Sequence, residues 1–176
     1  IQSSNVVSNF VTSKWNYLYT NDTVHDVMRW DLSSLAGKEI NNAWLTGIVT
    51  YRHPNGDACV SAPGTFPVVL NVYKILKAVN YSQVSWKYYK TGSQWTTAGA
   101  KSASDIDTTP VSSITIDTCT GQITMAGGAD FVAMLQGMVD TPATNYGFMM
   151  STSTTSPLGS YDIQSCDGNT ISARPV

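Results

Sequence analysis

The sequence predicts an all-β protein, an antiparallel β-sandwich with one short α-helix. Three observations lead to this fold class. Many short stretches are rich in β-branched and aromatic residues. Turn-forming residues separate these stretches, and only residues 129–139 place apolar side chains at helical spacing. Short strands, frequent turns and a single helix are typical of a sandwich. We see no internal repeat.

Length and composition indicate one domain, residues 1–176. Hydrophobic residues make up 42% of the chain, so a packed core is expected, while charged residues make up only 12%, about half the usual share. Serine and threonine occupy much of the predicted surface. The net charge of −2 provides no field that would attract nucleic acid. No apolar run approaches the ~18 residues of a membrane span, so none is predicted.

The first half of the chain is expected to contain several short strands. Residues 10–19 can hold one or two of them, and residues 24–32 form the next, which ends in a turn at residues 31–37. Residues 43–51 are rich in threonine and β-branched residues and predict a further strand. Within it, Gly47 indicates a bulge or a close neighbour.

Residues 52–67 contain three prolines and two glycines and predict a long loop. Residues 68–76 (VVLNVYKIL) are apolar on both faces, which favours a central position in a sheet. Residues 111–118 predict another strand, with Ile114 and Ile116 on one side. Residues 121–125 are expected to pair with it as a hairpin.

Residues 84–100 (VSWKYYKTGSQWTTAGA) fit no heptad or helical apolar stripe. Trp86 and Trp95 are interpreted as anchors that pin the two ends of an irregular excursion to a core. Gly92 and Gly99 are expected to adopt the positive φ that such a path requires. Five lysines gather in and around this stretch, and we interpret them as a solvated face: Lys74, Lys77, Lys87, Lys90 and Lys101.

The predicted helix, residues 129–139, has one apolar face formed by Phe131, Leu135, Met138 and Val139. Asp130 lies near its start, where a carboxylate favours the helix dipole. Two further strands are expected at residues 145–151 and 161–166.

The sequence offers little material for catalysis, and we do not expect an enzyme. The chain has only two histidines, His25 and His53, and no nucleophile, phosphate-binding or zinc motif. No cofactor is predicted. Asp105 and Asp107 alternate in a loop and can supply oxygen ligands to calcium, or they are simply solvated loop acids.

Three cysteines, Cys59, Cys119 and Cys166, lack the spacing of a metal site. They allow one disulfide and one remaining thiol. The remaining thiol is either buried or crosslinks two chains.

Aromatic side chains are the other candidate for chemistry, because sugar-binding sandwiches stack pyranose rings on exposed tryptophan or tyrosine. The candidates are Trp15, Trp44, Tyr88 and Tyr89. The alternative is that these side chains pack in the core. In an extended backbone Tyr88 and Tyr89 point in opposite directions, so one of them is expected to be exposed.

Four stretches carry a resemblance to a known family: MRWDLSSLAGKEINNAWL, VSWKYYKTGSQWTTAGA, FVAMLQGMV followed by NYGFMMS, and SCDGNTISARPV. Together they resemble the DNRLRE-type domain, and the resemblance covers residues from about Val24 to the end. It implies a jelly-roll-like β-sandwich, in a family that includes carbohydrate-binding modules. The family normally continues with a last strand after the Arg-Pro pair. Either that strand is cut from this chain or a neighbouring chain supplies it.

Two functions are therefore expected, both at an extracellular location or on a virion surface. The first is a non-catalytic structural subunit that decorates a virion, as a capsid or fibre protein does, or builds an extracellular assembly with other protein chains. The second is a carbohydrate-binding module that recognises an extracellular polysaccharide through exposed aromatics. The low-charge surface and the odd cysteine favour the first, and the family resemblance and the aromatics favour the second.

Overall fold

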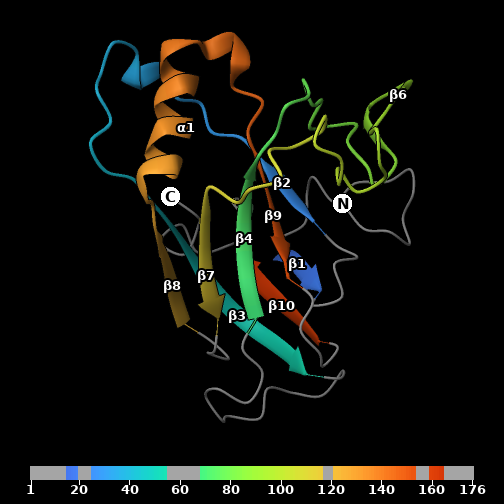
Figure 1. The fold of residues 1–176 in the computed structure, drawn as a ribbon. Coiled ribbons are helices and arrows are strands. Elements are labelled where there is room, and N and C mark those ends of the chain that lie inside the picture. Colours follow the sequence, from blue (N-terminus) through green and yellow to red (C-terminus); the bar gives the residue numbers. More distant parts are fainter. Residues whose placement is uncertain (1–14, 20–24, 55–67, 117–120, 154–158, 165–176) are drawn as a thin grey trace.

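The computed structural model describes residues 15–19, 25–54, 68–116, 121–153 and 159–164. For residues 15–19, 50–54 and 159–164 it describes the backbone alone. The parts that it describes are drawn in colour in Figure 1.

The described chain is built mainly from two four-stranded antiparallel sheets (Figure 1). The first sheet has the order β1 (Trp15–Tyr19), β10 (Gly159–Gln164), β3 (Trp44–Pro54) and β8 (Gly121–Ala126). The second sheet has the order β2 (Asp26–Met28), β9 (Phe148–Thr152), β4 (Val68–Lys74) and β7 (Ser112–Ile116). The remaining elements are a small hairpin of β5 (Tyr88–Lys90) and β6 (Ser93–Gln94), the helix α1 (Ala129–Asp140), and 3₁₀ turns at Ser33–Leu35 and Pro142–Thr144.

The strand pairs are nested along the chain. β1 pairs with β10, β2 with β9, β3 with β8, and β4 with β7. Two further pairings, of β10 with β3 and of β9 with β4, complete the sheets. This nested order is the connectivity of an eight-stranded jelly roll. The prediction of an all-β antiparallel fold with one helix is confirmed.

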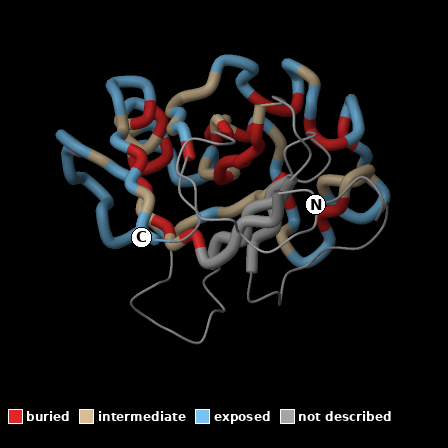
Figure 2. Tube along the Cα trace, turned by 90° about the horizontal axis from the view of Figure 1, so that it is seen from below, coloured by how far each residue is buried: buried red, intermediate tan, exposed pale blue. Residues whose placement is uncertain are grey.

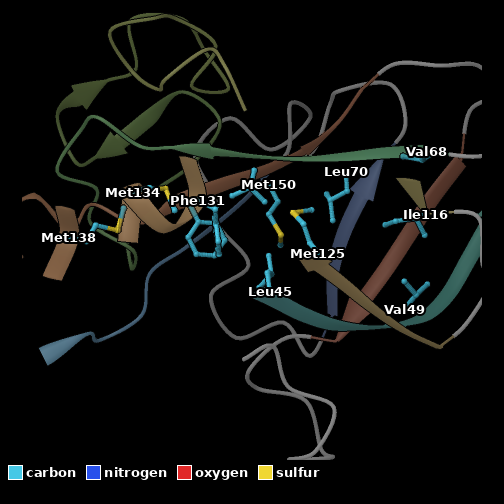
Figure 3. Close-up of a cluster of buried hydrophobic side chains, with 12 residues drawn as sticks. Leu45, Val49, Val68, Leu70, Ile116, Met125, Phe131, Met134, Met138 and Met150 are labelled. Carbon is cyan, nitrogen blue, oxygen red and sulfur yellow. The ribbon is translucent and has the colours of Figure 1, made fainter. Parts of the chain in front are cut away.

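One apolar core is shared by both sheets and by α1 (Figure 3). The first sheet contributes Leu45, Val49 and Met125, and the second contributes Val68, Leu70, Val72, Ile116, Phe148 and Met150. The helix adds Phe131, Met134 and Met138 from one end. Side chains of both sheets therefore meet in one core, which is consistent with a sandwich-like fold.

β4 lies between β9 and β7, as its two apolar faces predicted. Val68, Leu70 and Val72 point into the shared core. On the opposite face, Tyr73 packs against a second apolar cluster. The strand is therefore covered on both sides, which explains why its sequence does not alternate between apolar and polar residues.

The second cluster belongs to residues 75–110, which we call the aromatic lobe. Its buried members come from the lobe itself and from Met149 of β9. They are Ile75, Val79, Val84, Trp95, Ala100, Ile106 and Met149. The lobe thus covers the outer face of the second sheet. All five residues of β9 are buried, because Phe148 and Met150 face the shared core and Met149 faces the lobe.

Polar contacts hold the irregular backbone of the lobe. The Trp95 indole N–H donates to the Ser85 carbonyl at 3.0 Å. The Asp105 carboxylate accepts hydrogen bonds from the backbone N–H groups of Thr96 and Thr97, each at 3.0 Å. Figure 2 shows buried residues toward the inside of the molecule and exposed residues along its outer turns.

Several details of the sequence prediction are confirmed in this region. Trp95 is buried, and Gly92 and Gly99 adopt φ values of 74° and 82°. Trp86 is half-buried and packs against the second cluster. The predicted helix is also present and runs one residue further, to Asp140.

The predicted hairpin between residues 111–118 and 121–125 is wrong. β7 pairs with β4 in the second sheet, while β8 pairs with β3 in the first. Ile116 and Met125 both reach the shared core, from opposite sheets. The chain therefore crosses from one sheet to the other between β7 and β8. This crossing lets each strand bury its apolar face in the shared core, and the closeness of the two strands in sequence does not reveal it.

Three smaller corrections concern the ends of strands and a bulge. The strand expected at residues 24–32 spans only Asp26–Met28, since the 3₁₀ turn at Ser33–Leu35 follows soon after it. β3 extends through Pro54, so residues 52–54 belong to a strand and not to the expected loop, and residues 55–67 lie outside the described residues. No bulge occurs at Gly47, whose register with β8 is regular; the irregularity of β3 faces β10, between the pairs of Val49 and Tyr51.

Gly147, which precedes β9, offers a test of how closely the chain packs at the start of this strand. It has a φ of +80°, and a Cβ at this position would lie against the Tyr81 hydroxyl and the Met28 carbonyl oxygen. We expect Gly147→Ala to lower the free energy of unfolding by about 2–4 kcal/mol, because it adds a steric clash to the strain of positive φ. Urea denaturation monitored by tryptophan fluorescence would measure this.

Gly92→Ala is the matched control, because Gly92 has a φ of +74° but open space around the Cβ position. It should cost only about 1–2 kcal/mol. Equal losses for the two variants would contradict the close packing around Gly147.

Candidate functional site

An open depression of about 570 Å³ lies between residues 39–42 and the part of α1 that runs from Ala129 to Gln136. Its lining combines polar side chains with the backbone at the start of the helix. The lining residues are Glu39, Ile40, Asn41, Asn42, Gly127, Gly128, Ala129, Val132, Ala133 and Gln136.

Close backbone packing forms one wall of the depression. Gly127 donates its N–H to the Ala43 carbonyl at 2.9 Å. A Cβ on Gly127 would clash with that same carbonyl and with the Phe131 ring. Only glycine therefore lets the segment that leads into α1 approach the start of β3 so closely.

The side chain of Gln136 fastens the opposite wall to the helix. Its Oε1 accepts a hydrogen bond from the Ile40 backbone N–H at 2.7 Å. Its Nε2 donates to the Lys38 carbonyl at 3.2 Å and to Asp140 Oδ1 at 2.8 Å. One amide thus fixes the loop before β3, including the polar residues that it presents, against α1.

Trp44 does not line this depression, but its backbone lies next to residues that do. It directly follows Ala43, and its strand partner is Ala126, which precedes Gly127. Its side chain is 60% exposed, the largest exposure among the described bulky apolar residues. Because Leu45 points into the shared core, Trp44 lies on the outer face of the first sheet.

The same outer face continues with polar side chains along β3 and β8. Thr46 is paired with Thr124, with 3.5 Å between their hydroxyl oxygens. Gln122 Nε2 donates to Thr124 Oγ1 at 3.3 Å. This face therefore combines one exposed aromatic ring with hydroxyl and amide groups, and Glu39, Asn41 and Asn42 supply further polar groups in the depression beside it.

The other sugar-binding candidates are placed differently. The structure describes only the backbone of Trp15, in β1. Tyr88 and Tyr89 lie in the aromatic lobe, away from Trp44, and both are half-buried, so the prediction that one of them is exposed is wrong. Lys87 Nζ lies 5.5 Å from the Tyr88 ring centroid. The ammonium groups of Lys77 and Lys90 lie 5.9 and 5.6 Å from the ring centroid of Tyr89.

The two carboxylates considered for calcium do not share a site. Asp105 is completely buried and both of its oxygens accept backbone hydrogen bonds, so it organises the lobe. Asp107 is exposed. Within the described residues, no three His, Cys, Asp or Glu side chains gather in a way that could hold a metal ion. Cys59, Cys119 and Cys166 all lie outside the described residues.

Two titratable residues, His25 and the half-buried Asp26, follow one another at the start of β2. His25 is fully buried, with its Nδ1 2.7 Å from the Gly99 carbonyl oxygen and its ring packed on Trp86 at 5.0 Å. Asp26 Oδ2 is enclosed without a hydrogen-bond partner. Burial raises the pKa of Asp26 to about 7. Neither side chain lines the depression.

The sequence identified Trp44 but missed the depression beside it. Glu39 is the only glutamate in the chain, and it is followed closely by two asparagines, Asn41 and Asn42. That polar group before a strand was the available signal. Its meaning depended on Gln136, which is almost 100 residues away in the sequence and contacts Ile40 only in the folded chain.

Comparison with models of known protein families gives no match to this chain. Comparison with curated proteins gives none either. Among the described helices, α1 included, none has the length and apolar character needed to cross a membrane.

Asp26 should make stability depend on pH. Its raised pKa means that the unfolded chain loses this proton near pH 4, whereas the folded chain keeps it until about pH 7. Stability should therefore fall as pH rises from about 4 to 7 and level off above that. We expect Asp26→Asn to remove this decline, of about 3–4 kcal/mol at most, in urea denaturation at several pH values.

Asp31→Asn is the control, because Asp31 is exposed and its pKa is lowered by hydrogen bonds from Ser33. It titrates below this pH window and should leave the decline unchanged. A wild-type decline that persists in Asp26→Asn would contradict the assignment.

Proposed function

We propose that the protein is a non-catalytic domain that binds a carbohydrate on the outer face of β3 and β8. The observation that carries this proposal is the 60% exposure of Trp44, which is two residues beyond Asn42 in the lining of a polar depression. An exposed tryptophan costs hydration free energy, and a sugar ring that stacks on it removes its surface from water.

The neighbouring groups suit a sugar. Pyranose rings present apolar C–H faces to aromatic rings and hydroxyl groups around their edge. The edge hydroxyls can donate to Glu39 and the asparagine carbonyls, and they can accept from asparagine N–H groups. The threonines and Gln122 on the strands extend this hydrogen-bonding surface beyond Trp44.

The composition of the depression favours binding over hydrolysis. Glycoside hydrolysis ordinarily uses a pair of carboxyl groups on either side of the scissile bond. Among the described residues that line the depression, Glu39 is the one carboxylate. A lone carboxylate among amides is suited to accepting sugar hydroxyl hydrogen bonds.

Substitution of Trp44 tests this function. We expect Trp44→Ala to weaken binding in a glycan array or on insoluble polysaccharides by about 10-fold or more, because the stacking surface is lost. Trp44→Tyr should retain most of the binding. Leu76→Ala is the control, since Leu76 is also exposed (39%) but lies in the aromatic lobe. Unchanged binding by Trp44→Ala with an intact fold would refute the proposal.

A structural role in an assembly is a second candidate, and the edges of the two sheets favour it. β7 (SSITI) and β8 (GQITMA) contain neither charged residues nor proline. Within the described chain each has one partner strand, so each leaves one edge open. Proteins that avoid edge pairing usually place charges or prolines there. Edges of this kind suit strand addition by a neighbouring chain on an extracellular or virion surface.

Native mass in solution tests this second candidate. If the edges are used, light scattering should give a mass well above 19.0 kDa. Thr115→Lys, on the exposed side of β7, should then shift the protein toward the monomer. Thr46→Lys adds the same charge to β3, which has neighbours on both sides, and should not. A wild-type monomer at all concentrations would rule out self-assembly, and repeating the measurement with reductant would report on disulfide crosslinks.

A further inference from the structure

The aromatic lobe has a charge opposite to that of the whole chain. The lobe, residues 75–110, contains four lysines and two aspartates, a formal charge of +2, although the net charge of the protein is −2. Of the two aspartates, Asp105 is buried and bonded to backbone N–H groups, and Asp107 is exposed. The surface of the lobe is therefore locally cationic, a feature that the overall charge conceals.

Two of these lysines converge on one ring. The ammonium groups of Lys77 and Lys90 lie 5.9 and 5.6 Å from the centroid of Tyr89. The Tyr89 ring packs in turn on buried Trp95, with centroids 5.5 Å apart. Trp95 is fixed by its hydrogen bond to Ser85. The ring that both lysines approach is thus held in place by the folded lobe.

This arrangement lacks a counter-ion among the described residues, where neither Lys77 nor Lys90 forms an ion pair with a carboxylate. Two like charges near one ring repel each other, and the ring offsets this only in part. An oxyanion near the ring would attract the ammonium groups. Both lysines are therefore available to a negatively charged group from outside the described chain.

We propose that Lys77, Lys90 and Tyr89 form a binding site for the carboxylate or sulfate groups of an acidic polysaccharide. A glycan is favoured over a nucleic acid on two grounds. The ammonium groups stand near the Tyr89 ring, where a base would have to stack, and two defined charges are few for a phosphate backbone. A sugar that carries one anionic group needs only the lysine pair, with Tyr89 as an apolar neighbour.

This site is separate from the Trp44 face. The lobe covers the outer face of the second sheet through Met149, whereas Trp44 lies on the outer face of the first sheet. Figure 1 shows β6 of the lobe and α1 on different sides of β4. The two sites can therefore be tested independently, and either can fail without the other.

The experiment measures binding of the full chain to dextran sulfate and to unmodified dextran, which share a backbone, and to polygalacturonate, which carries carboxylates. We expect dextran sulfate or polygalacturonate, but not dextran, to bind the protein at 50 mM salt and more weakly at 200 mM. The polymer that binds more tightly, dextran sulfate or polygalacturonate, shows whether the site prefers sulfate or carboxylate. Lys77→Gln/Lys90→Gln should weaken that binding by at least 10-fold, and Lys90→Arg should retain it.

Lys38→Gln is the control for charge, since Lys38 is exposed and lies in the loop near α1. It should change binding less than 2-fold, and Trp44→Ala should leave binding to the acidic polymers intact. Near-ultraviolet circular dichroism would show whether Tyr89 and Trp95 keep their packing in each variant. The proposal is overturned if no acidic polymer binds, if Lys38→Gln weakens binding as much as the double variant, or if single-stranded DNA binds more tightly than both polymers.

Discussion

The burial of β9 on both faces is the constraint on which the rest of the structure depends. Phe148 and Met150 point into the core shared by the two sheets, and Met149 points the other way into the aromatic lobe. A strand of this kind cannot lie against water on either side, because its apolar side chains would be exposed. The lobe is therefore part of the fold, and its irregular backbone must be held by specific contacts such as those of Asp105 and Trp95.

The lobe also determines which aromatic rings remain open for recognition. Trp95 and Tyr89 are used for packing, and lysines stand near the rings of Tyr88 and Tyr89. Trp44 is in the opposite situation, since its strand neighbour Leu45 fills the core and leaves Trp44 on the outer face. Two kinds of surface follow, an aromatic polar face on one sheet and a cationic lobe on the other.

Local patterns in the sequence predicted the elements well where one residue type dictates the backbone. The helix, the central position of β4 and the positive φ of Gly92 and Gly99 follow from periodicity and from glycine chemistry. Pairing between strands was harder, because burial decides it and neighbours in sequence do not. β7 and β8 were expected to pair and instead belong to opposite sheets. The depression was out of reach for the same reason, since Gln136 and Ile40 meet only after folding.

The low charge of the chain connects the two proposed functions. With only 12% charged residues, the chain has little charge repulsion to prevent its association with other chains. The edge strands β7 and β8 carry no charged residue at all. In a protein that stays monomeric in solution, such edges are a hazard of association. A chain placed among polysaccharides or in an assembly instead gains from a surface that offers hydrogen bonds and an exposed ring at Trp44. The lysines near Tyr89 are the exception to this low charge. An anionic group on a polysaccharide partner would explain them.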